Sequence, residues 1–322
     1  MHFSGQSGKM RARRQVTVMK TGSYVAFGVV CAIWGSAWVP LGVLAQSMPA
    51  PLFSAAARFL IAGGVLAGVS VASGSKWPST RHTRGVLLLS ATFFGLPYGL
   101  MIWSAGHVSL GLSVGISATM PLCAAILTPF IAPPIGRKEI PSNAIQSMIL
   151  GLGGVVLVVY GALSTSGGQV EGSLAALIAV VLTVASMLYA KRELAGVSPI
   201  TAASLLLIGA AVWLASGSML LEHDQLTGWS RQTVEALLVL SLLGTALAYS
   251  VFFWLLQRIE PYKLAATQLI LPVVAAAEGY VALREQPPWT MWCGAAAVLA
   301  SVAALLRIHG DEGELLTLKA MK

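Results

Sequence analysis

Long uninterrupted apolar segments recur along this 322-residue chain and constrain its fold more than any other feature. Ten such segments lie near 22–43, 52–73, 83–104, 110–133, 142–162, 172–190, 199–220, 234–256, 262–283 and 289–308. A helix of about 20 apolar residues spans a bilayer, whereas a strand of a membrane barrel is about half as long and alternates apolar with polar residues. Runs such as 151–160 and 174–184 do not alternate. The sequence therefore predicts an all-α membrane protein with ten transmembrane helices.

Composition excludes the common soluble classes. The chain is 56% hydrophobic and 10% charged, against about 25% charged residues in a typical soluble domain. Its net charge of +8 arises from 20 Lys and Arg against 12 Asp and Glu, which cluster between the apolar segments. Nucleic-acid binding is therefore a poor explanation of the charge, and no nucleic acid is expected as a partner. Membrane lipid is the expected surrounding, in a plasma membrane or a bacterial inner membrane.

The distribution of positive charge predicts the orientation of the chain. Lys and Arg are enriched in the cytoplasmic loops of membrane proteins. With a cytoplasmic N-terminus, 17 of the 20 basic residues fall on the cytoplasmic side, Arg231 and Arg284 fall outside, and Arg58 lies within a helix. We therefore expect a multi-pass protein with both its N- and C-termini in the cytoplasm.

The ten segments divide into two sets of five that resemble each other. Sliding the chain by 151 residues pairs Tyr98 with Tyr249, Trp103 with Trp254 and Pro121 with Pro272. Because five is odd, the second set must cross the membrane in the opposite direction to the first. The predicted organisation is a cytoplasmic arm at 1–21, a five-helix repeat at 22–165, an inverted five-helix repeat at 166–308 and a cytoplasmic tail at 309–322.

Several motifs in this order resemble a known family. They are the segment from Trp34 to Trp38, the Ala-Ala-Arg-Phe step at 56–59, the prolines of the fourth and ninth segments, and Glu139 and Glu285 after them. Together they resemble the EamA-like members of the drug/metabolite transporter superfamily, over roughly residues 24–306. The resemblance implies that helices 1 to 4 and 6 to 9 surround a central cavity, with helices 5 and 10 at the periphery. It also implies transport of small metabolites, commonly export.

An inverted repeat suits a secondary transporter, because two halves of opposite direction can expose one central site to either side alternately. Together with a weakly polar interior that bears aromatic residues, this predicts alternating access to a small-molecule substrate that is neutral or zwitterionic, with amino acids or related compounds as the first expectation. Export is expected from the family resemblance alone. A lipid flippase, or another lipid-handling member of the same superfamily, is the alternative. The sequence does not fix an oligomeric state.

Enzyme chemistry finds little support in the sequence. Residues 111–115 fit the G-x-S-x-G pattern, but that nucleophile needs a strand-to-helix turn, and here it lies in an apolar helix. Walker A, H-E-x-x-H and Rossmann patterns do not occur, and Cys31, Cys123 and Cys293 form no C-x-x-C pair. We expect a protein that is not an enzyme and that needs no metal or cofactor.

Aromatic residues supply the first candidates for substrate contact. Trp34 and Trp38 lie four residues apart on one helix face, and Pro40 follows as a candidate hinge. Packing of both indoles against neighbouring helices is the alternative. Tyr98 and Tyr249 lie deeper in their segments, where a buried phenol needs a hydrogen-bond partner.

Polar residues near the prolines of the fourth and ninth segments supply the other candidates. Proline removes a backbone donor, and such breaks persist at membrane depth where a cavity or a side chain satisfies the carbonyl. We expect hinges at Pro121 and Pro272. The polar candidates for substrate contact are Ser113, Ser117, Thr267 and Gln268. A hydrogen bond between helices is the alternative role for Gln268.

Two ionisable residues, Arg58 and Glu278, lie inside apolar segments. Placing a charged side chain inside a membrane costs free energy, so such residues often have a function. Their depths below the outer surface are similar, so they are predicted to form an ion pair or to take part in coupling. The more specific hypothesis is that Glu278 carries a proton during transport. The alternative is that each side chain extends to the headgroups.

Overall fold

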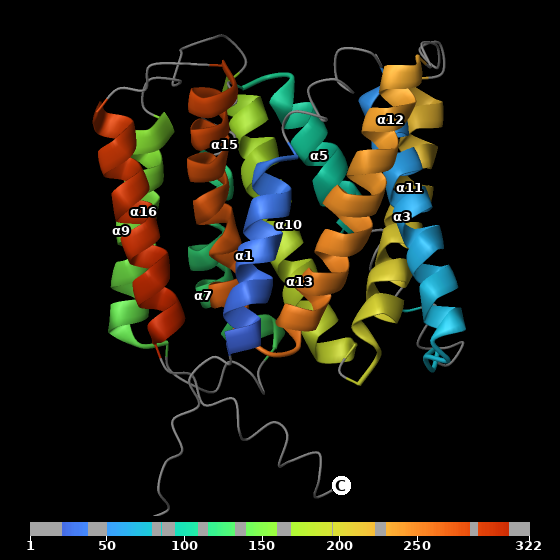
Figure 1. Cartoon of the computed structure of the whole chain (residues 1–322), viewed down its shortest axis with the longest axis horizontal. Helices are drawn as coiled ribbons and strands as arrows, with labels where there is room; N and C mark the ends of the chain where they lie inside the picture. The colour runs from blue at the N-terminus through green and yellow to red at the C-terminus, as the bar shows by residue number, and fades with distance from the viewer. Residues whose placement is uncertain are drawn as a thin grey trace, which may run out of the picture.

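The computed structural model describes residues 21–37, 50–78, 85, 94–108, 115–132, 140–159, 169–194, 196–222, 230–283 and 289–308. Within these ranges the side chains of a few helical residues, Glu278 among them, are outside the described part. The described residues form helices and turns, without a strand. The helices stand together in one bundle (Figure 1). This agrees with the predicted all-α class.

A described helix lies within each of the apolar segments. The first half holds α1 (Thr21–Gly35), α3 (Pro51–Ala72), α5 (Leu96–Ala105), α7 (Met120–Ile131) and α9 (Ser142–Val159). The second half holds α10 (Gln169–Glu193), α11 (Pro199–Leu221), α12 (Arg231–Val239), the π-helix η3 (Leu240–Leu247), α13 (Ala248–Leu256), α14 (Pro261–Ala265), α15 (Thr267–Leu283) and α16 (Trp289–Arg307). Four described helices are long and apolar enough to cross a membrane: 51–72, 170–193, 199–221 and 231–256. The last of these is the continuous rod of α12, η3 and α13.

The packing of the helices repeats between the two halves. In chain order, α1, α3, α5, α7 and α9 correspond to α10, α11, α13, α14–α15 and α16. Three pairs of counterparts pack on each other: α3 on α11, α7 on α14 and α9 on α16. Two further sets of contacts are matched, because α5 packs on α10 as α13 packs on α1, and α7 packs on α10 as α15 packs on α1. Such matched contacts are expected of two similar halves related by a two-fold axis.

Helices α3 and α11 run antiparallel and are joined at both ends. The carboxylate of Glu222, just after α11, accepts hydrogen bonds from the backbone N–H groups of Leu52 (2.9 Å) and Phe53 (3.0 Å). These first-turn groups have no partner within their own helix, and the positive end of the helix dipole favours a carboxylate there. At the other ends of the two helices, the hydroxyls of Ser70 and Thr201 lie 2.6 Å apart. Counterpart helices of opposite direction are the arrangement that an inverted repeat requires.

Several helix ends meet at one end of the bundle. Helix α1 begins beside the end of α16, where the hydroxyl of Tyr24 donates to the carbonyl of Leu306 (3.3 Å). The other links there run from Lys263 to the Ile308 carbonyl (2.6 Å), from Arg192 to the Ile131 carbonyl (3.1 Å) and from Lys191 to the Ile259 carbonyl. The start of α1 and the end of α16 therefore lie on the same side of the bundle.

The two halves enclose the centre of the bundle. Helices α9 and α16 pack on each other at one edge, and α3 and α11 pack on each other at the opposite edge (Figure 1). Helices α1, α10 and α13 lie between these edges (Figure 1). The last helix of each half is therefore peripheral, as the family resemblance implies.

Candidate functional site

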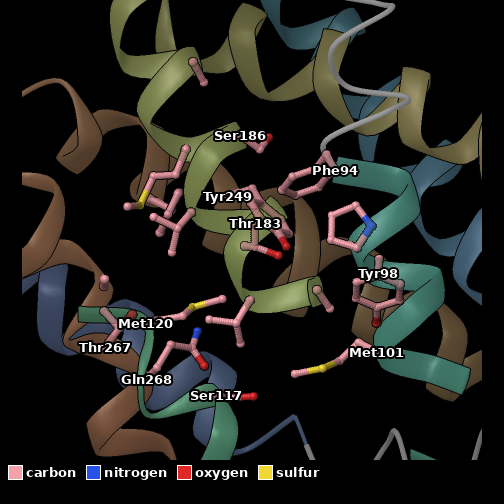
Figure 2. Close-up of a pocket in the computed structure, with 18 of the residues that line it drawn as sticks. Phe94, Tyr98, Met101, Ser117, Met120, Thr183, Ser186, Tyr249, Thr267 and Gln268 are labelled. Atoms are coloured by element: carbon pink, nitrogen blue, oxygen red, sulfur yellow. The ribbon is translucent and has the colours of Figure 1, made fainter. Parts of the chain in front are cut away.

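A cavity of about 200 Å³ lies among the central helices. The residues that line it come from both halves: Trp34, Phe94, Pro97, Tyr98, Met101, Ser117, Met120, Ala179, Val180, Thr183, Val184, Ser186, Met187, Ala190, Tyr249, Phe252, Phe253, Ala265, Thr267 and Gln268. Figure 2 shows Tyr98 and Met101 on one side of the cavity, with Thr267 and Gln268 across from them. Helices α9 and α16 contribute nothing to this described lining, and neither do α3 and α11, which the family resemblance placed around the cavity. Six of the eight residues proposed from the sequence as substrate contacts meet here: Trp34, Tyr98, Ser117, Tyr249, Thr267 and Gln268.

Aromatic rings form one continuous wall of the cavity. The ring of Tyr249 lies 5.4 Å from that of Trp34 and 5.2 Å from that of Phe94, both in edge-on geometry. Phe252 and Phe253 follow Tyr249 by three and four residues on α13, so they share its helix face and extend the wall. Edge-on ring pairs are favourable beyond the area that they bury. The wall therefore presents a preformed apolar surface to a bound molecule.

The position of Trp34 depends on the π-helix in the second half. Its indole N–H donates to the carbonyl of Gly244 (3.1 Å), which lies within η3. A π turn disrupts the regular ladder of helical hydrogen bonds, and such turns are frequent at functional sites. Residues 94 and 95 are also π-helical, and the 151-residue shift places them on 245 and 246. The indole N–H is thus occupied, and Trp34 offers the cavity its ring.

Two helices are interrupted where they border the cavity. The fourth segment has a helical turn at 115–117 and resumes as α7 at Met120, while α14 ends at Ala265 and α15 begins at Thr267. Threonine hydroxyls satisfy carbonyls at both interruptions, since Thr119 donates to Ile116 (2.6 Å) and Thr267 donates to Leu264 (2.9 Å). The donor capacity of Thr267 is therefore used within the backbone.

The predicted hinges lie beyond these interruptions. Pro121 is the second residue of α7, and Pro272 lies inside α15. Proline supplies no N–H to the carbonyl four residues earlier, which belongs to Ser117 in one half and to Gln268 in the other. Each proline thereby removes one helical hydrogen bond near an irregular turn, which lies at 118–119 in one half and at Ala266 in the other. Pro40, the third predicted hinge, is outside the described residues.

Gln268 and Tyr249 offer the cavity uncommitted polar groups. Among the described residues, no hydrogen-bond partner contacts the carboxamide of Gln268 or the hydroxyl of Tyr249, although both residues line the cavity. A carboxamide provides two donors and an acceptor, and a phenol provides one donor. These groups can therefore bind a polar ligand without breaking an existing contact.

Arg58 contacts the cavity wall from behind. Its Nη2 donates to the hydroxyl of Tyr98, and the guanidinium carbon lies 5.1 Å from the Tyr98 ring centre and 5.0 Å from that of Phe59. Its Nε is buried and has no partner among the described atoms. The side chain of Glu278 is outside the described part, so the predicted pair with Arg58 stays a prediction. Trp38 and Ser113, the other two proposed contacts, are also outside it.

Helix α10 supplies much of the cavity lining, and none of its residues was predicted from the sequence to contact substrate. Ala179, Thr183, Ser186 and Ala190 all face the cavity. Their spacing of four, three and four residues is that of one helix face, and all four are small. A stripe of small and polar residues on an otherwise apolar helix was the signal that could have identified them.

Comparisons with known proteins give consistent results. A solved crystal structure superposes with a TM-score of 0.74 over 94% of this chain and 99% of its own, at 15% identity, so the two share a fold. The uncharacterized transporter YoaV of Bacillus subtilis is 25% identical over 80% of this chain and 87% of its own. The uncharacterized inner membrane transporter YedA of Escherichia coli is 26% identical over 79% of this chain and 81% of its own. The sequence model of the EamA-like transporter family matches twice, at residues 22–160 and 170–307. This chain therefore belongs to the EamA-like transporter family and is a multi-pass membrane transporter.

Proposed function

We propose that this protein is a secondary transporter that moves small neutral or zwitterionic metabolites through the central cavity by alternating access. Amino acids and related compounds are the first substrate class to test, and export is the proposed direction. Ten transmembrane helices with both termini in the cytoplasm are part of the proposal, as is a role without enzyme activity.

One observation carries the proposal: a cavity with an aromatic wall and uncommitted polar groups lies between the two halves of a transporter fold. A single site shared by two inverted halves is what alternating access uses. Its apolar wall suits a hydrocarbon or aromatic group, while Gln268, Tyr98 and Tyr249 can bind polar ends. Neither the comparisons nor the described residues favour the lipid-handling alternative.

Uptake into proteoliposomes tests the proposal. The purified protein is compared with protein-free liposomes for flux of labelled amino acids, nucleobases and small aromatic compounds, with and without an imposed pH gradient. We expect saturable flux of at least one water-soluble class. Movement of labelled phospholipid between leaflets, with no flux of any water-soluble compound, would contradict the proposal.

The same assay tests proton coupling. If Glu278 carries a proton, then Glu278→Gln removes the response of flux to the pH gradient while leaving exchange of substrate at equal pH. Full pH-dependent transport by Glu278→Gln would exclude proton carriage by that residue.

A further inference from the structure

The two cavity tyrosines occupy equivalent places in the halves but have different partners. The 151-residue shift pairs Tyr98 with Tyr249, and both line the cavity. Tyr98 accepts a hydrogen bond from Arg58. Aligning Pro51 with Pro199, the first residues of α3 and α11, places the buried Leu206 at the position of Arg58. Arg58 thus donates a hydrogen bond to Tyr98, and the aligned position in the second half is the aliphatic Leu206, which has no such group to donate to Tyr249.

The contact with Arg58 determines what the hydroxyl of Tyr98 can do. A phenol has one proton to donate, and its oxygen here already accepts from a guanidinium. Among the described residues, no acceptor receives the Tyr98 proton, so the proton is available to a molecule in the cavity. A hydrogen bond from a positively charged donor draws electron density from the phenol oxygen, which strengthens the donor capacity of its O–H group.

The charge of Arg58 adds a preference for negative charge. Within the described part of the chain, the ion pairs join Arg192 to Glu193, Arg231 to Glu235 and Lys263 to Glu260, and none includes Arg58. Its Nε is buried and has no partner among the described residues. A cation inside an apolar region attracts an opposite charge more strongly than it would in water.

We propose that Tyr98, polarised by Arg58, donates a hydrogen bond to a carboxylate of the transported compound. The substrate class is then small monocarboxylates with an apolar or aromatic group, a class that includes zwitterionic amino acids. Tyr98 is the residue that contacts the substrate, and Arg58 is a positioning residue that acts through it. This inference rests on the proposed transport function and names the chemistry of its site.

Matched pairs of substrates test the inference in proteoliposomes that contain the full chain. Flux of labelled leucine and phenylalanine is compared with flux of leucinamide and phenylalaninamide, which keep the side chain and lose the carboxylate. Because a hydrogen bond to a charged group contributes more than one between neutral groups, the wild-type protein should favour the acid of a pair by about tenfold or more in kcat/KM. Tyr98→Phe and Arg58→Gln should each bring this ratio close to one, and Arg58→Lys should retain part of it.

Tyr249→Phe is the matched control, because it removes the equivalent hydroxyl from the cavity and leaves the hydrogen bond between Arg58 and Tyr98 in place. It should lower the flux of acid and amide to a similar degree and so preserve their ratio. Gel filtration and thermal unfolding show whether each variant is folded, and Tyr98→Phe decides the question if Arg58→Gln fails to fold.

The outcomes separate this inference from the proposed function. Equal flux of acid and amide in the wild-type protein would overturn the inference but not the proposed transport function. An acid-to-amide flux ratio in Tyr98→Phe equal to that of the wild-type protein would do the same. Saturable flux of nucleobases alone would do the same. Absence of flux of every water-soluble compound would overturn the proposed function and the inference with it.

Discussion

Individual side chains in the cavity differ in how far their polar groups are already committed. The indole N–H of Trp34 is bound to Gly244, and the hydroxyl of Thr267 is bound to Leu264. The carboxamide of Gln268 has no partner among the described residues. A polar group that is already hydrogen-bonded helps to fix the shape of the cavity, whereas one without a partner can bind substrate. Gln268 is therefore the residue for which loss of the polar group should affect binding most directly.

Substitution of Gln268→Ala should raise KM about twofold to tenfold, the range expected for loss of one hydrogen bond between neutral groups. Gln146→Ala is the control, since Gln146 is exposed on α9, away from the cavity. Concentration-dependent flux in proteoliposomes measures both variants. An unchanged KM in Gln268→Ala would show that this carboxamide does not contact the substrate.

Some cavity residues could be predicted from the sequence, because the repeat or an unusual polarity marks them. Others carry no such distinguishing feature and could not. Tyr98 and Tyr249 stood out because the repeat pairs them, and Gln268 because an amide is conspicuous inside an apolar segment. The contact between Arg58 and Tyr98 was not predictable, because it depends on how α3 and α5 are placed relative to each other. Thr183 and Ser186 on α10 were not predicted, because small polar residues on one face of a membrane helix also serve helix packing.

Contacts between helices depend on single residues at their ends and crossings. Glu222 binds the first turn of α3 from the end of α11 and is buried. At the crossing of α9 and α16, a side chain on Gly154 would meet backbone, because its Cβ would lie 2.8 Å from the carbonyl oxygen of Gly294. A Cβ on the adjacent Gly153 would meet nothing within 4 Å. These residues therefore control how closely paired helices can approach.

Substitution of Glu222→Ala should lower the free energy of unfolding by about 1–3 kcal/mol, because the N–H groups of Leu52 and Phe53 lose their acceptor. The control is Glu235→Ala, which breaks an exposed ion pair with Arg231 and should cost less than about 1 kcal/mol. Thermal unfolding in detergent measures the difference. Equal stability of the two variants would contradict the assigned role of Glu222.

Substitution of Gly154→Ala should separate α9 from α16 and destabilise the protein by about 1–3 kcal/mol, as expected of overpacking. Gly153→Ala should be neutral or stabilising, because alanine favours helix over glycine by up to about 1 kcal/mol. Thermal unfolding of the two variants under the same conditions provides the comparison. The packing of these helices would need revision if Gly153→Ala were the less stable variant.

At the scale of the whole molecule, the described helices form two similar halves of opposite direction around the central cavity. Apolar segment length and the 151-residue pairing were enough to predict helices and two repeats, because each depends on local hydrophobicity or chain order, whereas the peripheral last helices were expected only from the family resemblance. The π-helix η3 and the contact of Glu222 with α3 were not predictable. They depend on contacts between segments far apart in the chain.

The proposed topology can be tested by cysteine labelling. In a variant whose three native cysteines are replaced by alanine, Gly228→Cys lies in a loop proposed to face outside, and Ser75→Cys lies in one proposed to face the cytoplasm. An impermeant maleimide added to intact cells should label Gly228→Cys alone, and Ser75→Cys should react only after permeabilisation. Labelling of Gly228→Cys only from the cytoplasmic side would contradict the proposed orientation.

Blocking the cavity tests most directly whether it is the path of the substrate. Thr183→Trp places a large ring in the cavity, whereas Val181→Trp places the same ring on the exposed side of the same helix, where Val181 is 38% exposed. With equal amounts of folded protein in proteoliposomes, Thr183→Trp should reduce substrate flux to the level of protein-free liposomes, and Val181→Trp should transport like the wild-type protein. Flux through Thr183→Trp at the wild-type rate would contradict the claim that substrate crosses the membrane through this cavity.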